Sequence, residues 1–359
     1  MSKYQRPNIR RMDGYSWGEQ PQDRQTIKLN TNENPYPPSP AVADALSNFT
    51  AAELRTYPQP TADVMREHIA KLHDLSTRQV VVTHAGDEAL RLAITTYVSP
   101  GGTFASTDPS YSLYPVLAQI QDARTLRVDL EANWSIPPDF PAQARAADAQ
   151  LTCLVNPHAP SGYLTPVEQL HRIAEEISGV LLIDEAYADF VDPKIGYTSR
   201  ELVTQHDNVL VLRTFSKGYS LAGLRLGYLL GAEELITPII EKTRDTYNID
   251  AISQSLGIAA LQDQDYARAT WEKVREQRQF LAQTLNDLGW SCLASEGNFL
   301  LSTPPPNSIG AAEIYKRLKA EGILVRYFDH PRLHDKLRIS IGTKEQNQVL
   351  LENLRHLCR

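Results

Sequence analysis

The sequence predicts an α/β fold in two parts: a large domain with a mainly parallel sheet and a smaller α+β domain. Two observations lead to this prediction. Across roughly residues 31–245, short apolar runs of strand length alternate with amphipathic stretches whose apolar residues recur every three or four positions, as is typical of repeated strand–helix units. At 359 residues the chain is also too long for one small core, because a domain usually contains roughly 100–200 residues.

The elements of the predicted large domain follow one another in order. Residues 79–86, QVVVTHAG, are predicted as a strand, and residues 87–98, DEALRLAITTYV, as the helix after it. Residues 166–177, PVEQLHRIAEEI, form another helical pattern between two later strands. Those later strand-like runs are TFASTD (103–108), TLRVDL (125–130), LTCLVNP (151–157), VLLIDEAY (180–187) and NVLVLRTFS (208–216). The alternation predicts a mainly parallel sheet with crossover helices.

The pattern changes after about residue 245. A long polar–apolar helix at 265–289 precedes a strand at 298–303, a helix at 311–322 and a strand at 336–343. These elements predict the smaller α+β domain. The first 30 residues are polar and rich in turn-forming residues. We therefore expect an N-terminal arm at 1–30, a large domain at 31–245 and a small C-terminal domain at 246–359.

Composition excludes several classes of protein. The net charge is −7, with no long basic cluster, so a nucleic-acid-binding surface is not expected. Cys153, Cys292 and Cys358 are far apart and form no CxxC pair, which predicts neither a disulfide framework nor a zinc site. No metal site is expected. The sequence has no apolar run of membrane-span length and no signal-peptide core, so we expect neither membrane contacts nor a signal peptide. The cysteine content fits a reducing cytoplasm, where we expect the protein to lie.

Three ends of predicted strands carry polar residues. Ligands of open parallel sheets bind beyond the carboxyl ends of the strands, which makes these positions candidates for chemistry. Gly86 and Asp87 stand where a strand passes into a helix, whose free N–H groups suit an anion such as phosphate. Asp184 follows four apolar residues, and Lys217 follows the next strand. Taken singly, Gly86 is better explained by a tight connection and Asp184 by a helix cap or an ion pair, and Lys217 could equally form a salt bridge.

The combination of the three is more specific than each alone. Pyridoxal phosphate needs an amine for its aldehyde, an anion beside its ring nitrogen and donors for its phosphate. Lys217, Asp184 and the helix start at Gly86 would supply them at one sheet edge. Ser216 and Arg225 flank Lys217 and would add a hydroxyl and a guanidinium for the phosphate. The chain has neither a GxGxxG nor a GxxxxGK[ST] motif, so a dinucleotide site and a P-loop are not predicted.

From about residue 15 to the C-terminus, the chain resembles the pyridoxal-phosphate aminotransferases of fold type I, and among them the histidinol-phosphate aminotransferase family. Eight motifs occur in the order typical of that family. They are KLNTNENPYPPSP (28–40), RTYPQP (55–60), GDEAL (86–90), DPSYSLY (108–114), DEAY (184–187), LRTFSKGYSLAGLRLG (212–227), NFLL (298–301) and LRISIGT (337–343).

The resemblance implies catalytic roles for three residues and a contact for a fourth. Lys217 would hold the cofactor through its aldehyde and, once released, move a proton between substrate and cofactor. Asp184 would pair with the ring nitrogen. Tyr187 would donate to the ring's phenolic oxygen, and Tyr111 would stack on the ring.

The resemblance also implies binding residues. Gly86, Asp87, Ser216 and Arg225 would take the cofactor's phosphate, together with Tyr57 of a second subunit in a homodimer. Arg326 and Arg338 would bind the anionic end of the substrate, since a guanidinium meets carboxylate or phosphate with two parallel bonds. Tyr15 would close over the substrate, with Asn34 nearby.

One loop departs from the family pattern. Family members commonly carry an asparagine before the P-T-G of this loop, which donates to the cofactor's phenolic oxygen. Here the stretch is NPHAPSG (156–162), so Ala159 stands at that place. Either Asn156 or His158 substitutes, or Tyr187 serves that oxygen alone.

Three functions stay open at this point. The first is transamination of L-histidinol phosphate, with 2-oxoglutarate and glutamate as the partner pair. The second is another activity of the same fold, an aromatic amino-acid aminotransferase or a threonine-phosphate decarboxylase. The third is a non-catalytic regulator, which the lack of a basic DNA-binding domain makes the weakest of the three.

Overall fold

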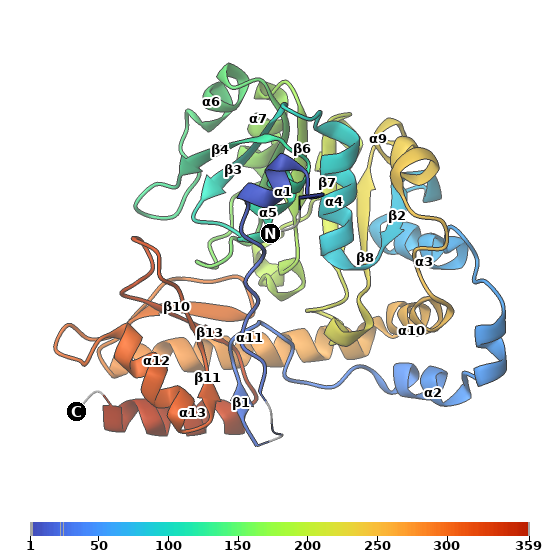
Figure 1. Cartoon of the computed structure of the whole chain (residues 1–359). Helices are drawn as coiled ribbons and strands as arrows, with labels where there is room; N and C mark the ends of the chain where they lie inside the picture. Colours follow the sequence, from blue (N-terminus) through green and yellow to red (C-terminus); the bar gives the residue numbers. More distant parts are fainter. Residues whose placement is uncertain (1–2, 22, 24, 358–359) are drawn as a thin grey trace.

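In the computed structural model, which describes residues 3–21, 23 and 25–357, the larger part of the chain is built on a seven-stranded sheet (Figure 1). The strand order is β2-β8-β7-β6-β5-β3-β4. The strands from β3 to β7 pair in parallel, and β8 runs antiparallel to both β2 and β7. The strands are β2 (Val80–Thr83), β3 (Thr103–Asp108), β4 (Arg124–Asp129), β5 (Ala149–Val155), β6 (Val180–Asp184), β7 (Val209–Thr214) and β8 (Gly227–Gly231). The predicted mainly parallel sheet is confirmed.

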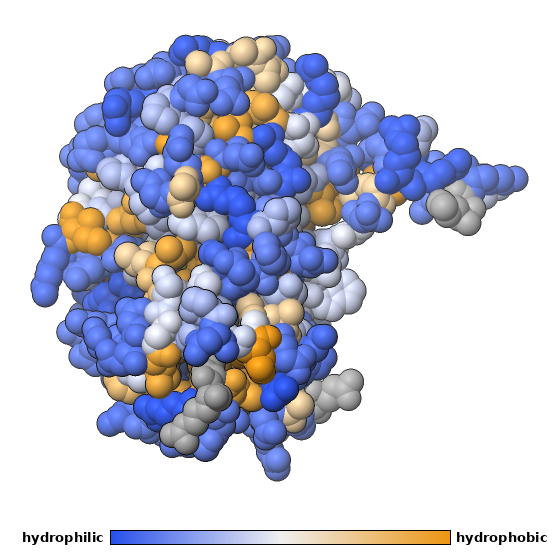
Figure 2. Space-filling view, turned by 90° about the vertical axis from the view of Figure 1, so that its left-hand side faces the viewer, coloured by the Kyte–Doolittle hydropathy of each residue, from blue (hydrophilic) through white to orange (hydrophobic). Residues whose placement is uncertain are grey.

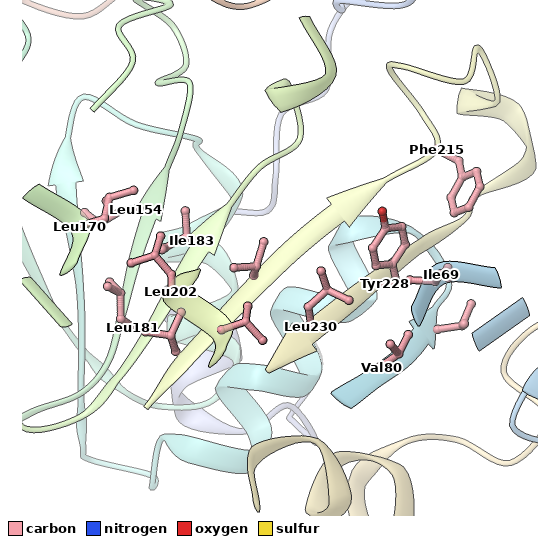
Figure 3. Packing of buried hydrophobic residues seen from close by; sticks show 14 of the residues in the cluster. Ile69, Val80, Leu154, Leu170, Leu181, Ile183, Leu202, Phe215, Tyr228 and Leu230 are labelled. Carbon is pink, nitrogen blue, oxygen red and sulfur yellow. The ribbon is translucent and has the colours of Figure 1, made fainter. Parts of the chain in front are cut away.

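Helices cover both faces of this sheet, which explains why its strands are apolar on both sides. Leu181 and Ile183 of β6 face one hydrophobic cluster, shown in Figure 3, and Leu182 between them faces another. Helices α6, α7 and α8 contribute to the first cluster, and α4 and α5 to the second. Their bounds are α4 (Ala85–Tyr97), α5 (Leu113–Ile120), α6 (Phe140–Ala146), α7 (Val167–Glu176), α8 (Arg200–Gln205) and α9 (Glu233–Pro238).

The smaller part is an α+β unit, as predicted. Its antiparallel sheet has the order β12-β13-β10-β9, and a separate parallel pair joins β1 to β11. The 24-residue helix α11 runs along this unit and into the larger part (Figure 1). Its elements are β9 (Ser291–Cys292), β10 (Phe299–Thr303), β11 (Ile323–Leu324), β12 (Arg326–Tyr327), β13 (Leu337–Ser340), α11 (Gln264–Asp287), α12 (Ala311–Ala320) and α13 (Lys344–Leu357).

Two packing contacts bear on the predicted division of the chain. Strand β1 (Ile27–Lys28) pairs with β11 of the smaller part, although the sequence suggested only an arm there. Helix α10 (Ala251–Gln262) packs on α2 (Pro40–Asn48) and α3 (Asp63–His73), on the side of the large sheet. This packing favours a boundary nearer the start of α11 than residue 245. The division into domains remains a prediction.

The N-terminal segment crosses from one part to the other (Figure 1). Helix α1 (Pro7–Arg11) is held to α5 by Asn8, whose amide donates to the Gln119 carbonyl at 2.8 Å. From there the chain runs to β1 in the smaller part. Helix turns of other types lie at Ala51–Arg55, Thr77–Gln79, Ala188–Phe190, Pro193–Ile195, Ala222–Leu224 and Ile239–Thr243.

The surface and the cysteines agree with the composition. On the face shown in Figure 2, apolar side chains lie in small groups between hydrophilic ones. Cys153 and Cys292 are free thiols, and Cys358 lies outside the described residues. No helix within the described part of the chain combines the length and the apolar character that a membrane crossing requires.

Candidate active site

A cavity of about 1040 Å³ opens beyond the carboxyl ends of the parallel strands. Asp184 at the end of β6 and Thr214 at the end of β7 line it from the large sheet. Arg326 and Arg338 line it from the smaller part. The cavity therefore lies where open parallel sheets usually bind ligands, between the two parts of the molecule.

Lys217 projects into this cavity from the turn after β7. Its Nζ donates a hydrogen bond to the Thr31 carbonyl at 2.7 Å. Burial lowers the pKa of Lys217 to about 8; the carboxylate of Glu33 opposes this shift, and the positive charges of Arg338, Lys28 and Arg225 add to it. An amine with a pKa near neutrality is present partly as the unprotonated nucleophile, which a purely structural lysine does not need.

Asp184 is almost fully buried, with an exposed fraction of 4%. The hydroxyl of Tyr114 donates to its Oδ2 at 2.8 Å, and the Ala186 N–H donates to its Oδ1 at 3.1 Å. Burial raises the pKa of Asp184 to about 6, although these two hydrogen bonds oppose the shift. A buried carboxylate with a raised pKa is stabilised by a cation placed against it.

The start of α4 lines the same cavity as Lys217 and has the chemistry that suits an anion. Gly86 and Asp87 lie in its first turn, whose N–H groups have no partner within the helix. Arg225 lies against this turn, with its Nη2 at 3.1 Å from the Asp87 carboxylate and its Nη1 at 3.4 Å from the Ser216 hydroxyl. A side chain at Gly227 would meet the Ala85 carbonyl carbon at 2.8 Å, so glycine there lets β8 pass close to the start of α4.

Aromatic residues form another wall of the cavity. The Tyr187 hydroxyl accepts a hydrogen bond from the Asn32 amide at 3.1 Å, and its ring meets Phe299 edge-on at 5.0 Å. Tyr111 lies edge-on to Tyr15, with ring centroids 6.0 Å apart. All three tyrosines line the cavity, and their contacts with cofactor and substrate stay predictions.

Arg326 and Arg338 are direct neighbours in the register of β12 and β13. Arg338 donates from Nη2 to the Asn30 carbonyl at 2.9 Å, while its buried Nε has no hydrogen-bond partner in the described structure. Burial lowers the pKa of Arg338, and the nearby charge of Arg326 lowers it further. No carboxylate of the described residues forms an ion pair with either guanidinium. Two adjacent guanidiniums of this kind form a receptor for an anionic ligand.

Three predicted site residues do not line the cavity of their own chain, and for Tyr57 the sequence expects this, because its predicted role is in a second subunit. Asn156 does not line the cavity, and its amide is engaged elsewhere: it donates to the Thr165 carbonyl at 3.2 Å and to the Tyr197 hydroxyl at 3.0 Å, and it accepts from the Thr165 N–H at 2.8 Å. Asn34 lies behind the cavity wall and donates to the Gly218 carbonyl at 3.3 Å. Tyr57 is 81% exposed and stacks on Tyr247, away from the cavity of its own chain.

The sequence interpretation missed Asn32 and Tyr114. Asn32 has a φ of +57°, a left-handed conformation that asparagine tolerates better than most residues. The resulting turn directs Asn32, rather than Asn34, to Tyr187. Tyr114 lies in the first turn of α5 and contacts Asp184, which is 70 residues later in the sequence. The second tyrosine in DPSYSLY was the sequence feature that marked it.

The chain is similar to known proteins over nearly its whole length. The model of the family described as aminotransferase class I and II matches residues 24–354. The protein named histidinol-phosphate aminotransferase 1 of Trichormus variabilis is 42% identical, with 100% of each chain covered. The histidinol-phosphate aminotransferase of Geotalea daltonii is 41% identical, with 95% of each chain covered.

A solved structure resembles the fold throughout. It is the histidinol-phosphate aminotransferase of Sinorhizobium meliloti in complex with pyridoxal-5'-phosphate, with a TM-score of 0.91 and 24% identity, covering 100% of this chain and 98% of that one.

Proposed function

The chain belongs to the class I and II aminotransferase family, and on that basis we propose that it transfers the amino group of L-histidinol phosphate to 2-oxoglutarate in histidine biosynthesis. The chain is an aminotransferase of fold type I that depends on pyridoxal phosphate. The observation that carries the proposal is one cavity that joins Lys217, Asp184 and the start of α4 to the paired arginines of β12 and β13.

The residues present fit the cofactor. The buried Asp184 carboxylate needs a cation, and a protonated ring nitrogen would supply one. The N–H groups of Gly86 and Asp87, with Ser216 and Arg225, would take the phosphate. When bound, pyridoxal phosphate supplies an aldehyde that takes up amino groups and a ring that withdraws electrons from the substrate carbon.

Each of the three catalytic side chains has one task in this proposal. Lys217 would hold the aldehyde and, when released, would move a proton between the substrate carbon and the cofactor's C4′, a role that a pKa of about 8 permits. Asp184 keeps the ring nitrogen protonated from within its buried site. Tyr187 donates from its hydroxyl to the phenolic oxygen while Asn32 orients it.

The altered loop at 156–162 would leave Tyr187 as the donor to the cofactor's phenolic oxygen. Ala159 lines the cavity and has no donor. His158 is engaged with the Ser161 hydroxyl at 2.7 Å and the Pro109 carbonyl at 2.9 Å, and Asn156 is engaged with Thr165. Of the three alternatives that the sequence left open, Tyr187 without help is therefore the one we propose.

The paired arginines support an anionic substrate. Histidinol phosphate carries a phosphate ester, and 2-oxoglutarate carries carboxylates, so one receptor at Arg326 and Arg338 would serve both half-reactions. Tyr15, at the mouth of the same cavity, would close over the substrate. Threonine-phosphate decarboxylation would use a similar receptor, whereas a neutral aromatic donor would not need it.

We further propose a cytoplasmic homodimer. Tyr57 is exposed on the surface of its own chain and stacks on Tyr247 at 4.6 Å, which leaves its hydroxyl free to reach a neighbouring subunit. It would complete the phosphate site of that subunit. The cytoplasmic location is proposed from the cysteine content of the sequence alone.

A panel of amino donors with 2-oxoglutarate, read by glutamate formation, tests the substrate. We expect L-histidinol phosphate to give the highest kcat/KM, above phenylalanine and the other neutral donors. A preference for phenylalanine would replace this proposal by an aromatic aminotransferase. Release of carbon dioxide from threonine phosphate would replace it by the decarboxylase.

A further inference from the structure

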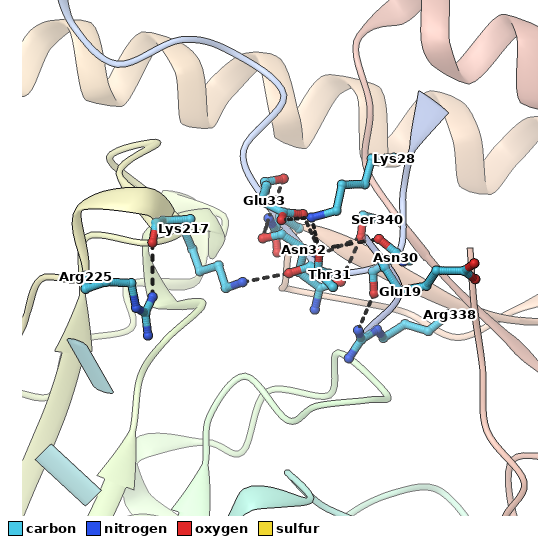
Figure 4. Close-up of polar contacts among 12 residues, drawn as sticks. Glu19, Lys28, Asn30, Thr31, Asn32, Glu33, Lys217, Arg225, Arg338 and Ser340 are labelled. Carbon is cyan, nitrogen blue, oxygen red and sulfur yellow. Dashed lines mark hydrogen bonds and ion pairs between the residues drawn. The ribbon is translucent and has the colours of Figure 1, made fainter. Parts of the chain in front are cut away.

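The four residues 30–33 contact three functional side chains of the cavity at once, those of Arg338, Lys217 and Tyr187, of which Figure 4 labels the first two. The Asn30 carbonyl accepts from Arg338 at 2.9 Å, and the Thr31 carbonyl accepts from Lys217 Nζ at 2.7 Å. Asn32 donates to the Tyr187 hydroxyl at 3.1 Å. The position of this short segment therefore affects the substrate receptor, the catalytic amine and the donor to the cofactor together.

An ion pair holds the segment from behind. Lys28, the last residue of β1, forms an ion pair with Glu33, and its Nζ also donates to the Thr31 hydroxyl at 2.7 Å. The Thr31 hydroxyl in turn donates to the second oxygen of Glu33. The pair closes a loop around Thr31, whose carbonyl is left pointing at Lys217 (Figure 4).

The remaining contacts of the segment fix its other side. The Asn32 N–H donates to the Ser340 hydroxyl at 2.9 Å, and this hydroxyl donates to the Asn32 side-chain oxygen at 2.9 Å. Asn298 donates to the Asn32 carbonyl at 2.9 Å. Residues 30–33 are thus anchored on Ser340 of β13 and on Asn298, the residue before β10, and Lys28 and Glu33 are the charged members of the anchor.

We propose that Lys28 and Glu33 are positioning residues for the transamination chemistry: their ion pair holds the Thr31 carbonyl against the released amine of Lys217, and the Glu33 carboxylate supplies the counter-charge that decides how readily this amine exchanges its proton. The proposal rests on the proposed function, in which Lys217 must be free and able to move a proton in each half-reaction. Neither residue touches the reacting atoms.

The charges around Lys217 support this assignment. Burial raises the pKa of Glu33, but hydrogen bonds from Lys28 and Thr31 outweigh it and hold that pKa below its usual value, so Glu33 is ionised near neutral pH. Among the groups that face Lys217, Arg338 on β13, Lys28 on β1 and Arg225 after β7 lower its pKa, and Glu33 raises it. Among these groups, Glu33 is therefore the one whose charge opposes the lowering of the Lys217 pKa by burial.

The two residues should then act in opposite directions. Glu33→Gln removes the counter-charge and keeps the shape, so the pKa of Lys217 should fall by about one unit, as expected for loss of a nearby opposite charge. Lys28→Met removes a repelling charge and also frees Glu33 to face Lys217, so the pKa of Lys217 should rise. A merely structural role would not give shifts of opposite sign.

The test is competitive labelling of Lys217 in the full-length chain stripped of pyridoxal phosphate. A small amine reagent at trace amounts is applied across a pH series, and the modified Lys217 peptide is quantified by mass spectrometry. We expect the labelling midpoint to move down in Glu33→Gln and up in Lys28→Met. Lys28→Arg, which keeps the charge, should restore the wild-type midpoint.

Glu313→Gln is the matched control, because Glu313 forms an exposed ion pair with Arg317 within α12. It should leave the midpoint unchanged. Midpoints that move in the same direction in both variants, or in neither, would overturn the inference. Fixation of the cofactor to a lysine other than Lys217 by borohydride is a separate result, which would overturn the proposed function.

Discussion

At the scale of single residues, burial shifts the pKa values of the two proposed catalytic groups, Lys217 and Asp184. Lys217 and Asp184 are shifted in opposite directions, the amine to a pKa of about 8 and the carboxyl to about 6. In both cases burial disfavours the charged form and is the largest cause. Both groups therefore titrate close to neutral pH, where a proton can be exchanged between site and ligand at low cost.

Asp184 should make cofactor binding depend on pH. Above a pH of about 6 the carboxylate is ionised and can hold the protonated ring nitrogen; below it the carboxyl is neutral. We expect affinity for pyridoxal phosphate, measured by titration of the stripped chain, to weaken as the pH falls through about 6. Asp184→Asn should remove this dependence and slow transamination at least about a hundredfold, since losing such an electrostatic contact costs roughly 2.7–4 kcal/mol.

Asp129→Asn is the control for this experiment, because Asp129 is exposed at the end of β4. Its pH dependence should match that of the wild type. Near-normal turnover of Asp184→Asn would show that another group protonates the ring nitrogen.

Tyr114 should tune the same carboxylate. Its hydroxyl donates to Asp184 and so favours the ionised form. In Tyr114→Phe the pKa of Asp184 should rise, which moves the midpoint of the cofactor-binding profile to higher pH. Tyr97→Phe removes a hydroxyl that donates to the Leu235 carbonyl instead and should leave the midpoint in place. An unchanged midpoint in Tyr114→Phe would show that Tyr114 does not affect the pKa of Asp184.

At the scale of elements, the sequence predicts strand ends better than it predicts turns. Lys217, Asp184 and Gly86 follow strands whose apolar runs are visible in the sequence, so their meeting at one sheet edge could be predicted. It could not be predicted that Asn32, rather than Asn34, lies at the cavity, because this depends on the left-handed turn at Asn32. Helix α10 is apolar over much of its length, and its pattern alone does not show which part of the molecule it covers.

The paired strands β12 and β13 carry Arg326 and Arg338, the two residues proposed to select the substrate. Arg338→Lys keeps the charge but loses the planar fork, so the apparent affinity for histidinol phosphate and for 2-oxoglutarate should fall, by roughly tenfold or more for a lost charge-assisted bond. Arg326→Ala should lower kcat/KM for histidinol phosphate more than kcat/KM for phenylalanine. The ratio of the two efficiencies, compared with wild type, is the measurement. A ratio that neither variant lowers would contradict the histidinol-phosphate assignment.

At the scale of the whole molecule, the cavity depends on both parts of the chain. The large sheet supplies Lys217, Asp184 and the anion site, and the smaller part supplies the two arginines. The segment from β1 to Glu33 passes from one to the other and contacts both sets. The sequence predicted the two parts, but not that the chain before residue 31 would pair with the smaller one.

The proposed dimer predicts complementation between inactive chains. Lys217→Ala lacks the amine, and Tyr57→Phe lacks the hydroxyl that would reach the neighbouring phosphate site. Mixed dimers contain one site with both groups intact, so mixing the two variants should restore part of the wild-type activity, measured with histidinol phosphate. A fully active monomer at assay concentration, shown by sedimentation, would contradict the proposal.

Borohydride reduction followed by peptide mapping tests whether Lys217 carries the cofactor. We expect a yellow protein in which reduction fixes a pyridoxyl group on the peptide that contains Lys217. The Lys217→Ala chain should bind the cofactor without any reducible linkage. If borohydride still fixes the cofactor to the Lys217→Ala protein, or fixes it to another lysine of the wild type, the account is wrong.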